Sequence, residues 1–130
     1  EGLAAVWYRH GVLARAIWAA VEAWGQGTEI GLNIADPANR SHAVTTVRIG
    51  GAYGTRLRHW MEREAGVTLG IPLGAGAEEE NGIFRIGHMG HVNAQMIMAV
   101  LGSLQAGMMA LKVPHGPGGL EAAAAVLAAG

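Results

Sequence analysis

Apolar residues at helical spacing mark the first 24 positions of the chain and predict one long amphipathic helix, ended by the glycines at 25 and 27. The stripe consists of Leu3, Val6, Trp7, Leu13, Ile17, Val21 and Trp24. Trp7 and Trp18 lie almost on one line of this helix, and we expect both in the core, although they could instead contact a neighbouring domain. The pattern is already established at residue 1, without an initiator Met, so we expect a piece of a longer protein.

Four short strands are predicted before the next long helix. Alternating apolar residues predict the first strand at 30–34, and a run of β-branched residues predicts the second at 42–49. Short apolar runs predict the third and fourth strands at 67–71 and 83–86. Between the second and the third, Thr55 is expected to cap a short helix that Gly66 ends.

A second long helix follows Asn93, which is a good N-cap residue. Its predicted buried stripe is Ile97, Val100, Leu101, Leu104, Met108 and Leu111. Gly102 and Gly107 inside this helix each destabilise it by about 1 kcal/mol relative to alanine, and they permit close approach of another backbone. An alanine-rich helix from Leu120 ends the chain. The elements lack a regular βαβα repeat, so we predict one α+β domain over 1–130, a small and mostly antiparallel sheet packed on helices.

Composition narrows the possible partners. The 130 residues carry a formal net charge of -1, which gives no basic field for nucleic acid or an anionic membrane. There is no cysteine, no signal peptide and no long apolar span, so we expect a cytoplasmic protein. Hydrophobic residues make up 51% and charged residues 15%, against a usual charged fraction of about 25%, which predicts a homo-oligomer.

Arg85 is the main candidate functional residue. It is a lone cation in the apolar run 83–86, and strand alternation places its side chain opposite Phe84 and Ile86. A guanidinium in such a place needs an anion, and its planar fork suits a carboxylate. Gly87 and Gly90 would leave room for a small ligand. The alternative is a structural salt bridge between Arg85 and a carboxylate of this chain.

Other catalytic patterns are weak. His88 and His91 have the spacing of a metal-ligand pair, but Gly90 indicates a turn and no third ligand has a recognised spacing, so we expect no metal. The two serines, Ser41 and Ser103, do not lie in a nucleophile elbow.

The remaining polar and glycine-rich segments also favour plain structural roles. The glycines of 69–76 match neither a Walker loop nor a dinucleotide fingerprint, and the acidic run 78–80 is expected in a solvated loop. Lys112, the single lysine, is expected to be a charge at a helix end rather than a covalent catalyst in a pocket.

The string Phe84-Arg85-Ile86-Gly87-His88-Met89-Gly90-His91, followed by Asn93 and a helix, resembles the C-terminal domain of class V, fold-type I aminotransferases, in the branch of the pyridoxamine–pyruvate and alanine–glyoxylate enzymes. The segments 1–3, 44–47 and 67–70 follow the same order. The resemblance implies that Arg85 binds the carboxylate of an amino or 2-oxo acid such as pyruvate or glyoxylate. It also implies that pyridoxal phosphate, or free pyridoxal or pyridoxamine, is bound mainly by a large domain that this chain does not contain.

Three functions therefore stay open. The first is the substrate-binding small domain of a pyridoxal-dependent transaminase, inactive by itself. The second is a non-catalytic small-molecule-binding or regulatory module that recognises a carboxylate through Arg85. The third is an interaction domain that docks a partner on its tryptophan and methionine surface.

Overall fold

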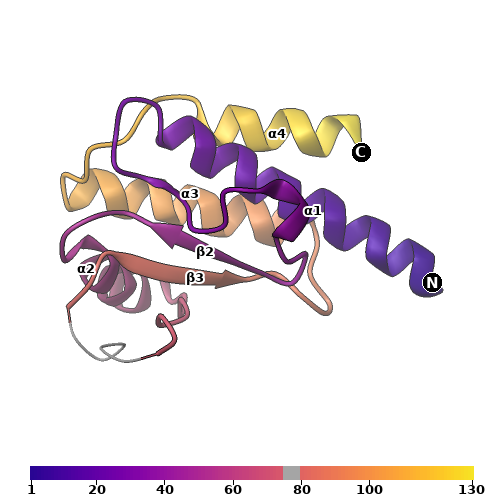
Figure 1. Ribbon diagram of the computed structural model, residues 1–130, viewed down its shortest axis with the longest axis horizontal. Helices are drawn as coiled ribbons and strands as arrows, with labels where there is room; N and C mark the ends of the chain where they lie inside the picture. Colours follow the sequence, from indigo (N-terminus) through magenta and orange to yellow (C-terminus); the bar gives the residue numbers. More distant parts are fainter. Residues whose placement is uncertain (75–79) are drawn as a thin grey trace.

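The computed structural model describes residues 1–74 and 80–130 and confirms the α+β class (Figure 1). Its α-helices are α1 (Leu3–Trp24), α2 (Tyr53–Trp60), α3 (Ala94–Ala110) and α4 (Gly119–Ala129). Its strands are β1 (Gly31–Leu32), β2 (Val44–Arg48) and β3 (Ile83–Gly87). A 3-10 turn, Pro37–Asn39, precedes β2, and a π-helical turn, Met61–Ala65, continues α2.

The three strands form one antiparallel sheet in the order β1-β2-β3. Because side chains alternate along a strand, the sheet has two different faces. Thr45 and Val47 on β2 and Phe84 and Ile86 on β3 are buried against the helices. The opposite face carries Thr46 and Arg85, which are directly paired across the two strands, together with Arg48 and Ile83. This second face is called the open face below.

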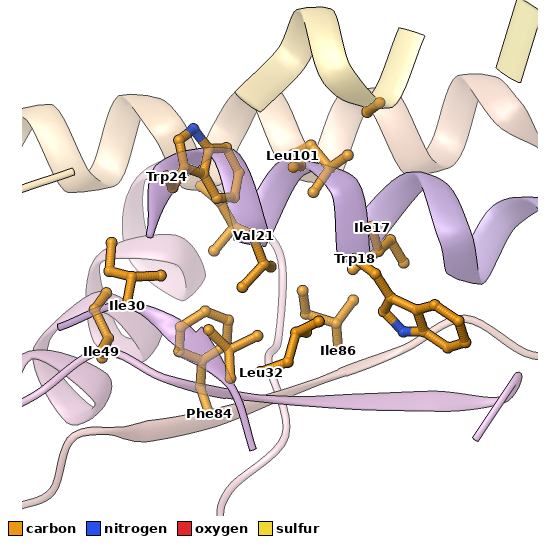
Figure 2. Close-up of a cluster of buried hydrophobic side chains, with 14 of the residues drawn as sticks. Ile17, Trp18, Val21, Trp24, Ile30, Leu32, Ile49, Phe84, Ile86 and Leu101 are labelled. Carbon is orange, nitrogen blue, oxygen red and sulfur yellow. The ribbon is translucent and has the colours of Figure 1, made fainter. Parts of the chain in front are cut away.

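The hydrophobic core lies between the sheet and the helices α1 and α3. Helices α1, α3 and α4 lie on one side of the sheet, and α4 lies farthest from it (Figure 1). Figure 2 shows Ile17 and Val21 on the side of α1 that faces Phe84 and Ile86 of the sheet. Trp24 lies on the other side of α1, where its Nε1–H donates to Gln105 Oε1 of α3. The predicted stripe of α3 is confirmed for Ile97, Leu101, Leu104 and Met108, which are at most 3% exposed, whereas Val100 and Leu111 are only half-buried. Asn93 caps α3 through a hydrogen bond from Met96 N–H.

The strands predicted at 30–34 and 42–49 are shorter in the structure, and the one predicted at 67–71 is absent. The first predicted strand pairs with β2 at Gly31 and Leu32, and Asn33 N–H still donates to the Thr46 carbonyl oxygen. Beyond it, the carbonyl oxygens of Ile34 and Ala35 accept hydrogen bonds from the Arg40 guanidinium instead. The prediction of a third strand over 67–71 is wrong. Only Gly70 pairs there, in an isolated bridge to Arg85, and Pro72 follows with no N–H to continue a ladder.

Two smaller predictions are also wrong. Thr55 lies inside α2 rather than at its N-cap, and its hydroxyl oxygen accepts a hydrogen bond from Asn81 N–H. Trp18 is buried as predicted, but Trp7 is 66% exposed, because α1 extends beyond the end of the sheet (Figure 1). Of the acidic run, Glu80 is exposed, and Glu78 and Glu79 lie outside the described residues. Within the described part of the chain, no helix has the length and apolar character that a bilayer span requires.

Candidate functional site

Arg85 occupies the middle of β3 on the open face, as the strand pattern predicted. Its backbone N–H and carbonyl oxygen bond Gly70 at 2.9 and 2.8 Å on the side of β3 away from β2. A Cβ at Gly70 would lie 3.1 Å from the Arg85 Cβ, so glycine lets this segment lie flat beside the arginine. Arg85 therefore lies between β2 on one side and Gly70 on the other, and both neighbours fix the position of its backbone.

Only the Nε–H of the Arg85 guanidinium makes a hydrogen bond within the described residues. Its Nε–H donates to the Ile71 carbonyl oxygen at 2.5 Å. Among residues 1–74 and 80–130, no carboxylate oxygen lies within 4.0 Å of it, and its two Nη groups have no hydrogen-bond partner. The structural salt bridge considered from the sequence is therefore not found in the described residues. The Nε bond fixes the plane of the guanidinium and leaves the Nη edge to bind a ligand.

A pocket of about 190 Å³ lies at Arg85, lined also by Asn33, Thr46, Pro72, Leu73 and Ile83. Drug-sized ligands occupy pockets of roughly 300 to 1,000 Å³, so this pocket suits a small acid. Its hydroxyl and amide groups come from β2 and from the residue after β1. Sequence reasoning missed these lining residues, because the strand register that brings them to Arg85 depends on tertiary contacts.

The other arginines nearby are bound to the protein itself. Arg40 donates to two backbone carbonyl oxygens and to Glu22, and its guanidinium lies 5.3 Å from the centre of the Trp18 ring. Arg9 pairs with Glu1 at 3.0 Å. Arg48 lies on the open face, but it extends toward β1, where its Nη2 lies 3.3 Å from the Leu32 carbonyl oxygen. Among these four arginines, only Arg85 has both Nη groups without a hydrogen-bond partner in the described residues.

Gly87 and Gly90 have open space where a side chain would lie, and for Gly90 the structure also shows a role in the turn after β3. Neither lines the pocket at Arg85. Gly90 has a φ of 84°, in the left-handed region that favours glycine, and its N–H donates to His10 Nε2 at 3.0 Å. Arg9 Nη1 donates to the Gly90 and Val92 carbonyl oxygens. Gly90 therefore shapes the turn that follows β3 and fastens it to α1.

His88 is fully buried and belongs to a hydrogen-bonded network, whereas His91 is exposed. Trp18 Nε1–H donates to Thr45 Oγ1 at 3.0 Å, and Thr45 Oγ1 lies 2.8 Å from His88 Nε2. His88 Nδ1 lies 3.1 Å from the His42 carbonyl oxygen. Because His88 Nδ1 donates to the His42 carbonyl oxygen, Nε2 of the neutral ring carries no proton and accepts from the Thr45 O–H. The expected absence of a metal remains a prediction, although no cluster of metal-binding side chains occurs among the described residues.

The buried His88 predicts weaker folding at acid pH. Burial, partly opposed by backbone hydrogen bonds, lowers the pKa of His88 below its ordinary value of 6.5. The unfolded chain therefore binds more protons than the folded chain in the window from this lowered pKa up to 6.5. We expect the free energy of unfolding to fall as the pH falls through this window, measured by urea unfolding at a series of pH values.

The matched control for that measurement is His59→Gln, because His59 is exposed on α2. This variant should keep the pH slope of the parent chain, whereas His88→Gln should reduce it. A stability that stays flat or rises on acidification through the window would contradict the role given to His88.

The remaining chemical candidates either make hydrogen bonds within the chain or lie exposed. Lys112, with a φ of 55°, follows the end of α3 and is exposed, unlike the desolvated lysine that covalent chemistry requires. Ser41 accepts a hydrogen bond from Ala43 N–H, and Ser103 donates to the Ala99 carbonyl oxygen. The described residues therefore offer a place for a small carboxylate but do not fit a covalently held cofactor.

Comparison with known proteins supplies the context of this site. No family model matches the chain. Serine–glyoxylate aminotransferase of Methylorubrum extorquens is 32% identical over 127 residues, which are 95% of this chain and 29% of that enzyme.

Two solved structures share the fold. The crystal structure of pyridoxamine–pyruvate aminotransferase from Mesorhizobium loti gives a TM-score of 0.82 at 32% identity, covering 98% of this chain and 32% of that one. Ureidoglycine–glyoxylate aminotransferase from Bacillus subtilis gives a TM-score of 0.83 at 27% identity, again covering 98% and 32%. The chain thus spans about a third of the length of each of these proteins.

Proposed function

We propose that this chain, which resembles the C-terminal domain of class V aminotransferases in sequence and in fold, is the substrate-binding small domain of a pyridoxal-dependent transaminase. The full-length enzyme moves an amino group between pyridoxamine or an amino acid and a small 2-oxo acid, pyruvate or glyoxylate. The names of the similar proteins support this reaction class, since each is an aminotransferase and their acceptors are glyoxylate or pyruvate.

The observation that carries the proposal is the state of Arg85. Its Nε is held by the Ile71 carbonyl oxygen, its Nη edge has no partner among the described residues, and a small pocket lies beside it. A guanidinium oriented in this way binds a carboxylate through two parallel hydrogen bonds. The role of this chain is thus to bind and orient the acid, with Thr46 and Asn33 as further polar groups of the pocket.

The cofactor belongs to the rest of the enzyme in this proposal. When bound, pyridoxal phosphate or its free form supplies an electron sink for the reaction. We assign no residue of this chain to it, because the sole lysine is exposed and lies at the end of a helix. The full-length enzyme is proposed to be a cytoplasmic homo-oligomer with a large cofactor-binding domain.

The isolated chain is expected to show no transaminase activity with alanine and glyoxylate as substrates. The physical reason is that Lys112 is a solvated amine outside any pocket, so it cannot hold the cofactor in a reactive geometry. The measurement combines an activity assay with borohydride treatment in pyridoxal phosphate and mass spectrometry of the chain.

The full-length protein is the comparison in that experiment. It should use pyruvate or glyoxylate as acceptor and contain a lysine-bearing cofactor domain outside this chain. Turnover by the isolated chain with a reduced adduct at Lys112 would contradict the assignment. So would a full-length protein that binds the acid but has no cofactor lysine, which would support the regulatory module instead.

A further inference from the structure

Three polar side chains form one row across the open face of the sheet. Thr46 of β2 is the direct partner of Arg85 of β3. On the other side of β2, Asn33, the residue after β1, donates its backbone N–H to the Thr46 carbonyl oxygen at 3.0 Å. Because directly opposite residues of neighbouring strands point to the same face, the side chains of all three project from the open face. They line the same pocket.

The backbone hydrogen bonds make Thr46 and Arg85 close neighbours. The N–H and the carbonyl oxygen of Arg85 both bond Gly70, on the side away from β2, and the Thr46 carbonyl oxygen accepts from Asn33. The Thr46–Arg85 pair is therefore of the non-hydrogen-bonded kind, in which opposite side chains approach most closely. Opposite residues in a sheet have Cβ atoms about 4.5 to 5.5 Å apart, with the shorter separations in such pairs.

The Thr46 hydroxyl and the Arg85 Nη groups are both available to a ligand. Neither has a hydrogen-bond partner among residues 1–74 and 80–130. The bond from Arg85 Nε–H to the Ile71 carbonyl oxygen holds the guanidinium on the side of β3 away from β2, so the space over Thr46 remains part of the pocket. A small ligand on the Nη edge therefore has the Thr46 hydroxyl beside it.

A carboxylate needs more donors than the guanidinium alone supplies. Its two oxygens offer about four lone-pair positions, and a bidentate guanidinium occupies two of them. Three of the other side chains that line the pocket, those of Pro72, Leu73 and Ile83, are apolar and cannot donate a hydrogen bond. A lone pair left without a donor beside such side chains would cost binding energy. Thr46, the cross-strand partner of Arg85, is the nearest residue of the row that can donate to it.

We propose that Thr46 is a second substrate-binding residue, whose hydroxyl donates a hydrogen bond to the carboxylate that Arg85 holds. The proposal rests on the proposed function, which supplies the acid that enters the pocket. Transamination changes the carbon next to the carboxylate and leaves the carboxylate itself unaltered. The Thr46 hydrogen bond is therefore of similar strength in the bound acid and in the transition state, and its loss should raise KM rather than lower kcat.

The variant Thr46→Val tests the hydroxyl, because valine keeps the branched shape that suits a strand. In the full-length enzyme it should raise KM for pyruvate and glyoxylate about 10- to 100-fold with kcat nearly unchanged, as expected for one lost hydrogen bond to a charged group. Thr46→Ser retains a hydroxyl and should bring KM back close to the value of the parent. The matched control Thr68→Val removes an exposed hydroxyl outside the pocket and should leave KM unchanged.

The role of Thr46 and the proposed function fail in different ways. If Thr46→Val keeps the parent KM while Arg85→Ala loses the use of the acid, the role of Thr46 is overturned and the proposed function stands. A rise in KM that Thr46→Ser does not reverse would also overturn it, because the hydroxyl would then not be the cause.

If the full-length parent turns over no oxo acid, the proposed function fails and Thr46 is tested by binding alone. The isotope-labelled chain is then titrated with pyruvate, and the Arg85 Nε–H signal is followed by nuclear magnetic resonance. Weaker binding by Thr46→Val than by the parent and by Thr68→Val would support the hydrogen bond. Equal affinities in the three chains, or no binding by the parent, would overturn it.

Discussion

Replacing Arg85 with alanine in the full-length enzyme is expected to lower kcat/KM for the 2-oxo acid by about two orders of magnitude or more. Hydrogen bonds to charged groups contribute about 1.5 to 3 kcal/mol each, and a bidentate guanidinium–carboxylate pair makes two of them. Cofactor binding should change little, because we assign no cofactor contact to this chain. Steady-state kinetics with pyruvate and glyoxylate, together with a cofactor titration, measure both quantities.

Two further variants make this result specific. Arg85→Lys should recover only part of the loss, because an ammonium keeps the charge but loses the fork that is held in plane by the Ile71 carbonyl oxygen. Arg48→Ala removes the other arginine of the open face, which extends toward β1, and should leave the acid kinetics close to those of the parent. If Arg85→Ala lowers the melting temperature while kcat/KM for the acid is unchanged, Arg85 is a structural residue.

The orientation of Arg85 could be predicted from the sequence because it follows from local periodicity. Phe84 and Ile86 are apolar neighbours in a strand, so Arg85 had to project from the other face. The cap and the buried stripe of α3 also follow from local sequence, since Asn93 is its N-cap and Leu104 is buried, as predicted. Identifying the ligand as a carboxylate of an oxo acid also required the resemblance to a family, because a lone arginine fits several anions.

The environment of Arg85 could not be predicted, because it depends on contacts between distant segments. Ile71 was assigned to a strand, yet its carbonyl oxygen binds the guanidinium from an irregular segment. His88 was weighed as a metal ligand, whereas its partners are Thr45 and His42, more than forty residues away. Trp7 lies on the same line of α1 as Trp18, but α1 extends beyond the end of the sheet, and Trp7 is therefore exposed.

The two glycines of α3 have different surroundings in the structure, although the same role was predicted for both from the sequence. This difference has consequences for the stability of the chain. A Cβ at Gly107 would lie 2.6 Å from Leu57 Cδ1 and 2.8 Å from Trp60 Cε3. A Cβ at Gly102 would meet no atom within 4 Å. The close approach of another backbone, predicted for both positions, is therefore not found at either: Gly102 faces open space, and Gly107 is approached closely by side chains of α2.

Gly107→Ala is accordingly expected to destabilise the chain by about 1 to 2 kcal/mol. Overpacking a filled core costs about 1 to 3 kcal/mol, and the better helix propensity of alanine offsets about 1 kcal/mol of it. Leu57 cannot move aside easily, because it is fully buried. Gly102→Ala gains the same propensity without a clash and should stabilise the chain by about 0.5 to 1 kcal/mol. Urea unfolding of both variants measures the difference, and stabilisation by both substitutions would show that α2 and α3 are not in contact at Gly107.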